Sequence, residues 1–164
     1  VDAYQDITIP FQMSSKEFFT LVKDHLNEGG VMVVNMNMHN SDAAAHDNIT
    51  DYLSDTIASV FPNVCTVDVP DYTNRELFAS SSPDMLKNMH KNTADVSNAA
   101  LMSFMEQASE GFEAYNKGSL LLTDDKAPVE LLGMKEIDGL IRDEVGYYRD
   151  IYNKDGLQGL MQQL

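Results

Sequence analysis

The stretch SSKEFFTLVKDHLNEGGVMVVNMNM, residues 14–38, decides the fold class. Its first half predicts a helix of about three turns, because Ser14 and Glu17 form a capping box and two glycines at 29–30 end the segment. The apolar residues of this helix share one face: Phe18, Leu21, Val22 and Leu26. From Val31 the apolar residues become continuous, which is typical of a strand covered on both faces in a parallel sheet. The stretch therefore predicts an α/β fold.

The residues that follow predict one more helix and two short strands. Apolar residues at spacings of three and four mark the helix, with Ser41 or Asp42 as its cap: Ile49, Leu53, Ile57 and Val60. The segments VCTVDV and ELFASS, which begin at Val64 and Glu76, predict strands joined by the polar turn PDYTNR. We expect these two strands to form an antiparallel pair at the edge of a mostly parallel sheet with flanking helices.

The second half of the chain is predicted to be mostly helical. One helix is indicated by the apolar residues between Ala94 and Met105, and another by Ile137, Leu140, Ile141 and Val145. Because no repeat and no interdomain linker interrupts the pattern, residues 1–164 are expected to belong to a single domain.

Composition narrows the classes of ligand. The chain has 26 acidic and 11 basic residues, a net charge of −15, which repels phosphate backbones and argues against nucleic acid as a partner. A cationic ligand suits this charge, although acidity also confers solubility. Cys65 is the single cysteine, so no intramolecular disulfide can form and a reducing compartment is expected. Without a membrane-length apolar run, the chain is expected to be cytoplasmic.

The chain opens on VDAYQDITIPF, residues 1–11, an acidic loop with only Val1 in place of a preceding strand. A buried strand at residues 31–38 needs a neighbour on both edges, and no G-x-G-x-x-G run that could grip a nucleoside follows a strand. We therefore expect this chain to be the back part of a longer fold whose front half binds the cofactor.

Two segments carry a resemblance to a known family. The residues VDAYQDITIPFQMSSKEFFTLVKDHLNEGGVMVVNM at 1–36 resemble the centre of the spermidine synthase family, and LLLTDDKAPVELL at 120–132 resembles a signature near its end in bacterial members. The resemblance implies the C-terminal portion of a Rossmann-like, class I S-adenosylmethionine-dependent methyltransferase fold. It also implies transfer of an aminopropyl group from decarboxylated S-adenosylmethionine to a polyamine such as putrescine.

The chemistry that the resemblance implies needs carboxylates. A neutral amine attacks the carbon beside a sulfonium, so the site must hold a polycation and take a proton from the attacking nitrogen. Family enzymes commonly carry D-x-x-D in the first loop, which places Asp2 as a catalytic residue. The second position of that motif is Gln5 here, and Asp6, one place later, is the candidate base. Tyr4 and Gln5 are candidate substrate-binding residues of the same pocket, with a packing role for the tyrosine equally open.

A second acidic cluster contains Asp124 and Asp125, with Glu130 close by. One interpretation is a turn that caps a helix starting near Pro128. The other makes Asp124 and Asp125 a substrate-binding wall of the amine pocket, converging with Asp2 and Asp6. No metal site is expected, because the four histidines form no ligand pattern with these acids.

Two classes of function remain open at this point. The first is an aminopropyltransferase, with methyl transfer from S-adenosylmethionine as a variant on the same fold. The second is a polyamine-binding protein without turnover, which the departure at Gln5 favours. We expect a homodimer, no activity in this chain alone, and the possibility of membrane helices elsewhere in the parent protein.

Overall fold

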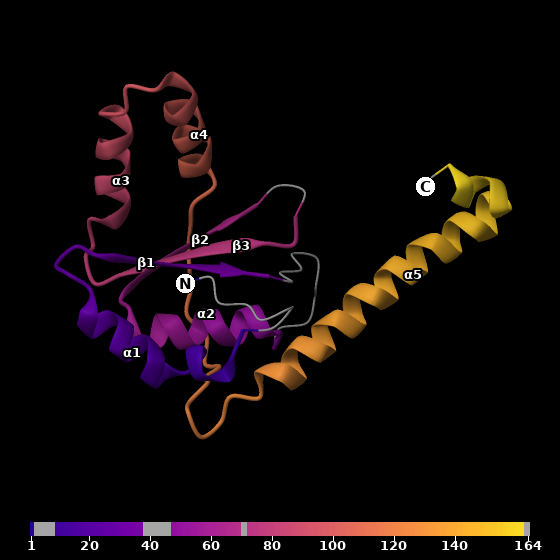
Figure 1. Cartoon of the computed structure of the whole chain (residues 1–164), viewed down its shortest axis with the longest axis horizontal. Helices are drawn as coiled ribbons and strands as arrows, with labels where there is room; N and C mark the ends of the chain where they lie inside the picture. Colours follow the sequence, from indigo (N-terminus) through magenta and orange to yellow (C-terminus); the bar gives the residue numbers. More distant parts are fainter. Residues whose placement is uncertain (2–8, 38–46, 70–71, 163–164) are drawn as a thin grey trace.

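The computed structural model describes residues 1, 9–37, 47–69 and 72–162, and its elements form a sheet with helices on both sides (Figure 1). The first half contains a short 3-10 helix, two α-helices and two strands: η1 (Phe11–Met13), α1 (Lys16–His25), β1 (Val31–Met36), α2 (Ile49–Val60) and β2 (Asn63–Asp68). The second half adds β3 (Arg75–Ser80), α3 (Met85–Ala94), α4 (Ala99–Glu110), β4 (Glu113–Ala114) and α5 (Val129–Met161). The α/β class is confirmed.

The sheet has the strand order β1-β3-β2-β4, and every one of these neighbouring pairs is antiparallel. The prediction of a mostly parallel sheet is therefore wrong. The strands β2 and β3 do form the expected antiparallel pair, but β3 is central, because it inserts between β1 and β2 instead of lying at the edge. Since β1 and β2 are each antiparallel to β3, they run in the same direction, and α2 connects them.

Val1 lies on the other edge of β1. Its backbone nitrogen donates to the carbonyl of Val33, and the backbone nitrogen of Asn35 donates to the carbonyl of Val1 at 3.3 Å. Two bonds that bracket Val34 in this way are the pattern of a parallel pair. The backbone of β1 is thus antiparallel to β3 on one side and meets Val1 in the parallel sense on the other.

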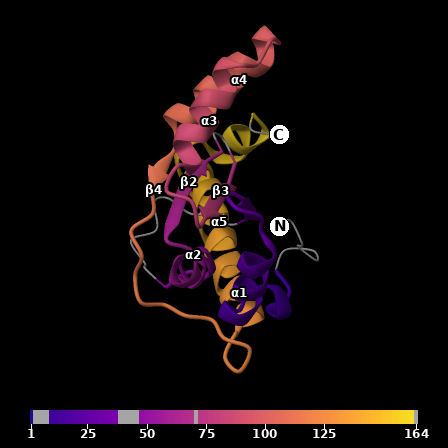
Figure 2. The ribbon, with the colours of Figure 1, turned by 90° about the vertical axis from the view of Figure 1, so that its left-hand side faces the viewer.

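The core lies between the sheet and the layer formed by α1 and α2. Alternate residues of β1 are buried on this face: Met32, Val34 and Met36. The cover expected on the other face is only partial, because Val31 is exposed there and Val33 is half-buried. Helix α1 contributes Phe19, and α2 contributes Leu53 and Ile57. The opposite face of the sheet meets only the α3–α4 hairpin among the described elements (Figure 2).

Both helices of this layer begin at side-chain caps. Ser15, and not the expected Ser14, caps α1 by accepting a hydrogen bond from the backbone of Phe18 at 3.1 Å. Asn48 caps α2 by accepting from the backbone of Asp51 at 2.8 Å. The predicted cap at Ser41 or Asp42, which lie outside the described residues, is therefore wrong, because α2 begins only at Ile49.

The helix expected near residues 94–105 is one arm of a hairpin. Helix α3 ends at Ala94, and Asn98 caps α4 by accepting from the backbone of Leu101 at 3.0 Å. Helix α3 was not predicted from the sequence, because its many polar residues hide a weak apolar face. The hairpin lies on the side of the sheet away from α1 and α2 (Figure 1).

The chain then crosses the helical layer as an extended strap, residues 115–122. Tyr115, Gly118 and Leu120 donate to the buried carboxylate of Asp55 on α2 at 2.8, 2.6 and 2.9 Å. The backbone of Leu122 donates to Thr56 at 2.9 Å and accepts from the backbone of Lys16 at 2.9 Å. The strap thus joins α2 to the start of α1.

Helix α5 follows the strap and extends away from the sheet (Figure 1). Val129 is fully buried, and Leu132, Ile137 and Leu140 pack against the core, so the first part of the helix is anchored. Gly156 has a φ of 65°, which interrupts the helical backbone near its end. No helix in the described part of the chain is both long enough and apolar enough to cross a membrane.

Replacement of Asp55 by alanine is expected to lower the free energy of unfolding by about 2–3 kcal/mol, because three donors lose a charged acceptor. Chemical denaturation followed by circular dichroism measures this change. The matched control is Asp24→Ala on the exposed surface of α1, for which a change within about 0.5 kcal/mol is expected. Equal losses in the two variants would contradict the role given to Asp55.

Candidate functional site

The candidate residues of the first loop lie outside the described residues. These are Asp2, Tyr4, Gln5 and Asp6. Their convergence with Asp124 and Asp125 therefore stays a prediction. The described residue before them, Val1, pairs beside Val34, near the carboxyl end of β1.

An acidic cavity of about 280 Å³ lies at the start of α2. Asp47, Asp51 and Asp55 line one side, and Tyr115 with the strap residues 116 and 118–120 lines the other. Asp51 and Asp55, four residues apart, lie on one side of α2, and Asp47 precedes the cap of that helix. The acidic spacing is visible in the sequence, although the cavity was not predicted from it. Three carboxylates around one cavity favour a cationic ligand.

The hydrogen bonds divide these three carboxylates into two kinds. Asp55 is buried and accepts from the three donors of the strap, so it is a structural residue. Within the described part of the chain, no lysine, arginine or histidine forms an ion pair with Asp47 or Asp51. Asp51 also lies in the first turn of α2, where its charge stabilises the helix N-terminus. Asp47 and Asp51 are therefore the carboxylates that a ligand can meet.

The negative charge of this cavity acts on the groups around it. Burial raises the pKa of the Tyr115 hydroxyl well above its usual value, and the hydrogen bond to Asp55 and the charges of Asp55 and Asp51 raise it further. The hydroxyl therefore remains a proton donor and keeps its bond to Asp55. Burial also raises the pKa of Glu136 on α5; Lys135 opposes that shift and Asp51 adds to it.

The cluster at Asp124 and Asp125 lies in a tight turn between Thr123 and Lys126, whose backbones bond to each other at 2.8 and 3.1 Å. Asp124 accepts from the Ser15 hydroxyl at 2.5 Å, and its backbone nitrogen donates to Glu17 at 3.1 Å. The turn is thus attached to the N-terminus of α1. Neither aspartate is among the described residues that line the acidic cavity.

The interpretation of this cluster as a cap of the next helix is wrong. Helix α5 does start beside Pro128, but no side chain in the described ranges caps it. The carboxylate of Asp124 serves the start of α1 instead, and Asp125 is exposed on the turn. Their substrate-binding role stays a prediction.

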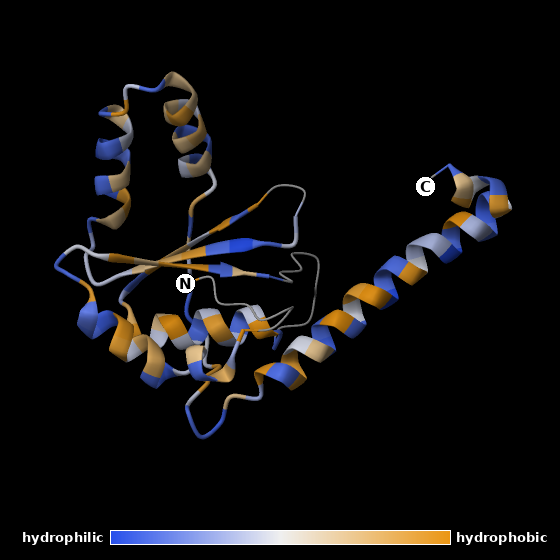
Figure 3. Ribbon diagram, viewed as in Figure 1, coloured by the Kyte–Doolittle hydropathy of each residue, from blue (hydrophilic) through white to orange (hydrophobic). Residues whose placement is uncertain are grey.

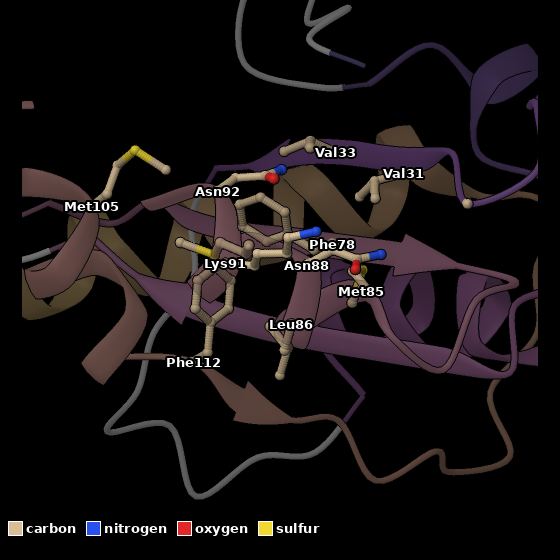
Figure 4. Close-up of a pocket in the computed structure, with 12 residues that line it drawn as sticks. Val31, Val33, Phe78, Met85, Leu86, Asn88, Lys91, Asn92, Met105 and Phe112 are labelled. Carbon is tan, nitrogen blue, oxygen red and sulfur yellow. The ribbon is translucent and has the colours of Figure 1, made fainter. Parts of the chain in front are cut away.

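An apolar cavity of about 600 Å³ lies between the sheet and the α3–α4 hairpin (Figure 4). Val31, Val33 and Phe78 form its floor, and the methionines Met85, Met89 and Met105 of the hairpin line its walls. Its lining includes Lys91 and, among the described residues, no carboxylate. This chemistry suits a polyamine less well than the acidic cavity does.

Cys65 is not a suitable nucleophile. It is buried in β2, and burial raises the pKa of its thiol to about 11. The reactive thiolate is therefore scarce near neutral pH.

Comparison with known proteins gives one informative relative. The chain is 50% identical, over 98% of its length, to a curated protein of Bifidobacterium longum (strain NCC 2705) named as a probable polyamine aminopropyl transferase. The chain spans 39% of the length of that protein, within its C-terminal part. A search against protein-family models found no match. The resemblance to the spermidine synthase family that was expected from the sequence is confirmed.

Replacement of Asp124 by alanine is expected to lower the free energy of unfolding by about 1 kcal/mol, because Ser15 and the start of α1 lose their charged partner. Asp125→Ala, next to it on the same turn, is expected to change it by less than about 0.5 kcal/mol. Thermal and chemical denaturation of the two variants test this difference. A larger loss for Asp125→Ala would contradict the assignment.

Proposed function

We propose that this chain is the C-terminal part of the catalytic domain of a polyamine aminopropyltransferase and that its acidic cavity binds part of the polyamine. The observation that carries the proposal is the 50% identity with the Bifidobacterium protein over 98% of the chain. The acidic cavity supports it independently, because its chemistry is that of a site for an organic cation.

The spacing of the carboxylates suits a linear polyamine. Asp51 lies in the first turn of α2, and Asp47 precedes Asn48, the cap of that helix. Both line the cavity, so the two carboxylates can meet different ammonium groups of one linear amine. The apolar stem of the amine would lie along the strap, where Leu120 also lines the cavity.

The proposed reaction moves an aminopropyl group from the sulfur of the donor to a nitrogen of the amine. The unprotonated amine attacks the aminopropyl carbon next to the sulfonium; the new C–N bond forms as the C–S bond breaks, and sulfur keeps the electron pair as a neutral thioether. The nitrogen then carries an extra proton, which a carboxylate accepts. We assign this step to the first loop, with Asp2 orienting the amine and Asp6 as the base, and we keep Tyr4 and Gln5 as substrate-binding residues.

The donor, decarboxylated S-adenosylmethionine, needs a site that the described residues do not offer. No Gly-rich turn follows β1, β2 or β3 within the described ranges, so no cradle for a nucleoside is found there. The Bifidobacterium relative is longer than this chain. We therefore assign donor binding to a part of the protein outside this chain, which corresponds to the remaining length of that relative. The parallel contact of Val1 with β1 supports a class I methyltransferase-like sheet that continues beyond this edge.

A second function, polyamine binding without turnover, is favoured by Gln5 at the usual second acidic position of the loop. The two functions share the acidic cavity and differ in the first loop. Binding and turnover experiments therefore separate them.

Calorimetry with spermidine tests the cavity directly. Asp51→Asn is expected to weaken spermidine binding by about tenfold, because one carboxylate facing the cation is neutralised. The matched control is Asp24→Asn, which removes the same charge from the exposed surface of α1. Equal weakening in both variants would mean that spermidine responds only to the net charge of −15, and would overturn the assignment of the cavity.

Turnover tests the first loop in the complete protein that contains this chain. Asp2→Asn is expected to lower aminopropyl transfer by at least ~10²-fold, because the amine is no longer oriented or deprotonated. Retained spermidine binding with no transfer in the unmodified protein would favour the binding function instead. Unchanged turnover in Asp2→Asn would remove Asp2 from the mechanism.

A further inference from the structure

Helix α5 presents two different apolar faces. The first contains Val129, Leu132, Ile137 and Leu140, and it packs against the core. The second runs along the part of the helix that extends from the body, where apolar segments recur along the ribbon (Figure 3). Large side chains on this second face are exposed: 69% for Leu131, 53% for Ile141 and 59% for Val145. A long exposed apolar stripe on a helix indicates an interaction surface.

The stripe has the period of a coiled coil. We call its six residues the α5 seam: Leu131, Met134, Ile141, Val145, Tyr148 and Tyr152. Neighbouring members are three or four residues apart, except where a polar residue takes the place of one member and leaves a gap of seven. They occupy the a and d positions of successive heptads, with Leu131, Val145 and Tyr152 at a. The one interruption is Asp138, also at a. A stripe that keeps a strict seven-residue repeat favours left-handed supercoiling around a partner helix.

The charges beside the seam identify the partner. Lys135, Arg142 and Arg149 recur every seven residues on one flank, at position e. Glu130 and Glu144 lie on the other flank, at position g. In a parallel, in-register pair, a g residue meets the e residue five places later on the other helix. Glu130 then faces Lys135, and Glu144 faces Arg149, of a second copy of this chain.

We propose that the α5 seam forms a parallel, in-register, two-stranded coiled coil between two copies of this chain. An antiparallel pair would bring the two e flanks together, and those flanks are uniformly basic, so repulsion opposes it. The charge pattern is complementary to itself only in the parallel register, which favours a second copy over an unrelated helix. The interruption of the helix at Gly156 follows the last seam residue, Tyr152, and limits the coiled coil to this stretch.

Asp138 sets a limit on the strength of this dimer. The parallel register places the two Asp138 carboxylates opposite each other at an a position, where their like charges repel. The dimer is therefore weaker than the apolar residues alone would make it. Asp138→Leu is expected to tighten the dimer by at least about tenfold.

Sedimentation equilibrium of the 164-residue chain tests the interface. The mass is expected to rise with concentration from 18.3 kDa toward twice that value. Ile141→Asp is expected to raise the dimer dissociation constant at least about tenfold, whereas Leu157→Asp, an exposed site on α5 beyond the seam, is expected to leave it within about twofold. Because both side chains are exposed, neither change should unfold the chain. A chain that stays monomeric, or a dimer that Ile141→Asp does not weaken, would overturn the proposal.

A charge exchange tests the orientation. Glu144→Arg and Arg149→Glu, each alone, place like charges opposite each other and are expected to weaken the dimer, and the double variant is expected to recover it. Val145→Cys should form an intermolecular disulfide under mild oxidation, because the two copies of an in-register a position adjoin. Absence of recovery together with absence of the disulfide would overturn the parallel register.

Discussion

Asp55 buries its carboxylate beneath the strap, and the path of the second half of the chain follows from this contact. The carboxylate accepts three hydrogen bonds from the strap, and the approach is so close that a Cβ at Gly118 would lie 2.5 Å from it. Only glycine fits there without displacing the carboxylate. Because the strap connects β4 to α5, the same contact fixes where α5 leaves the body.

The contact also shapes the acidic cavity. Because the strap lies across α2, Tyr115 and Leu120 form a wall opposite Asp47 and Asp51. The carboxylate of Asp55 accepts its hydrogen bonds from the strap, so Asp47 and Asp51 remain available to a ligand. The turn at Asp124 lies further along the chain and is attached to α1 instead. The two acidic clusters therefore have different surroundings.

Local signals in the sequence predicted local structure well. The helix at α1, the strand at Val31 and the α2 periodicity are confirmed because caps, glycines and apolar spacing act within one element. The central position of β3 could not be predicted from such local signals. Strand order depends on contacts between residues distant in sequence, such as Val31 with Ser80. The contact of Asp124 with Ser15, the cap of α1, was missed for the same reason, because the two residues are 109 positions apart. The acidic cavity was within reach, because the spacing of Asp47, Asp51 and Asp55 is visible in the sequence.

Binding of a polyamine in the acidic cavity beside the strap differs measurably from binding to an acidic surface at large. A spermidine titration followed by backbone amide chemical shifts in the isotope-labelled chain separates the two. Binding in the cavity predicts the largest shift changes at Asp47, Asp51 and Gly118, with small changes at Asp125 on the exposed turn and at Asp24 on α1. Shift changes spread evenly over exposed acidic residues, or confined to the turn at Asp125, would contradict it.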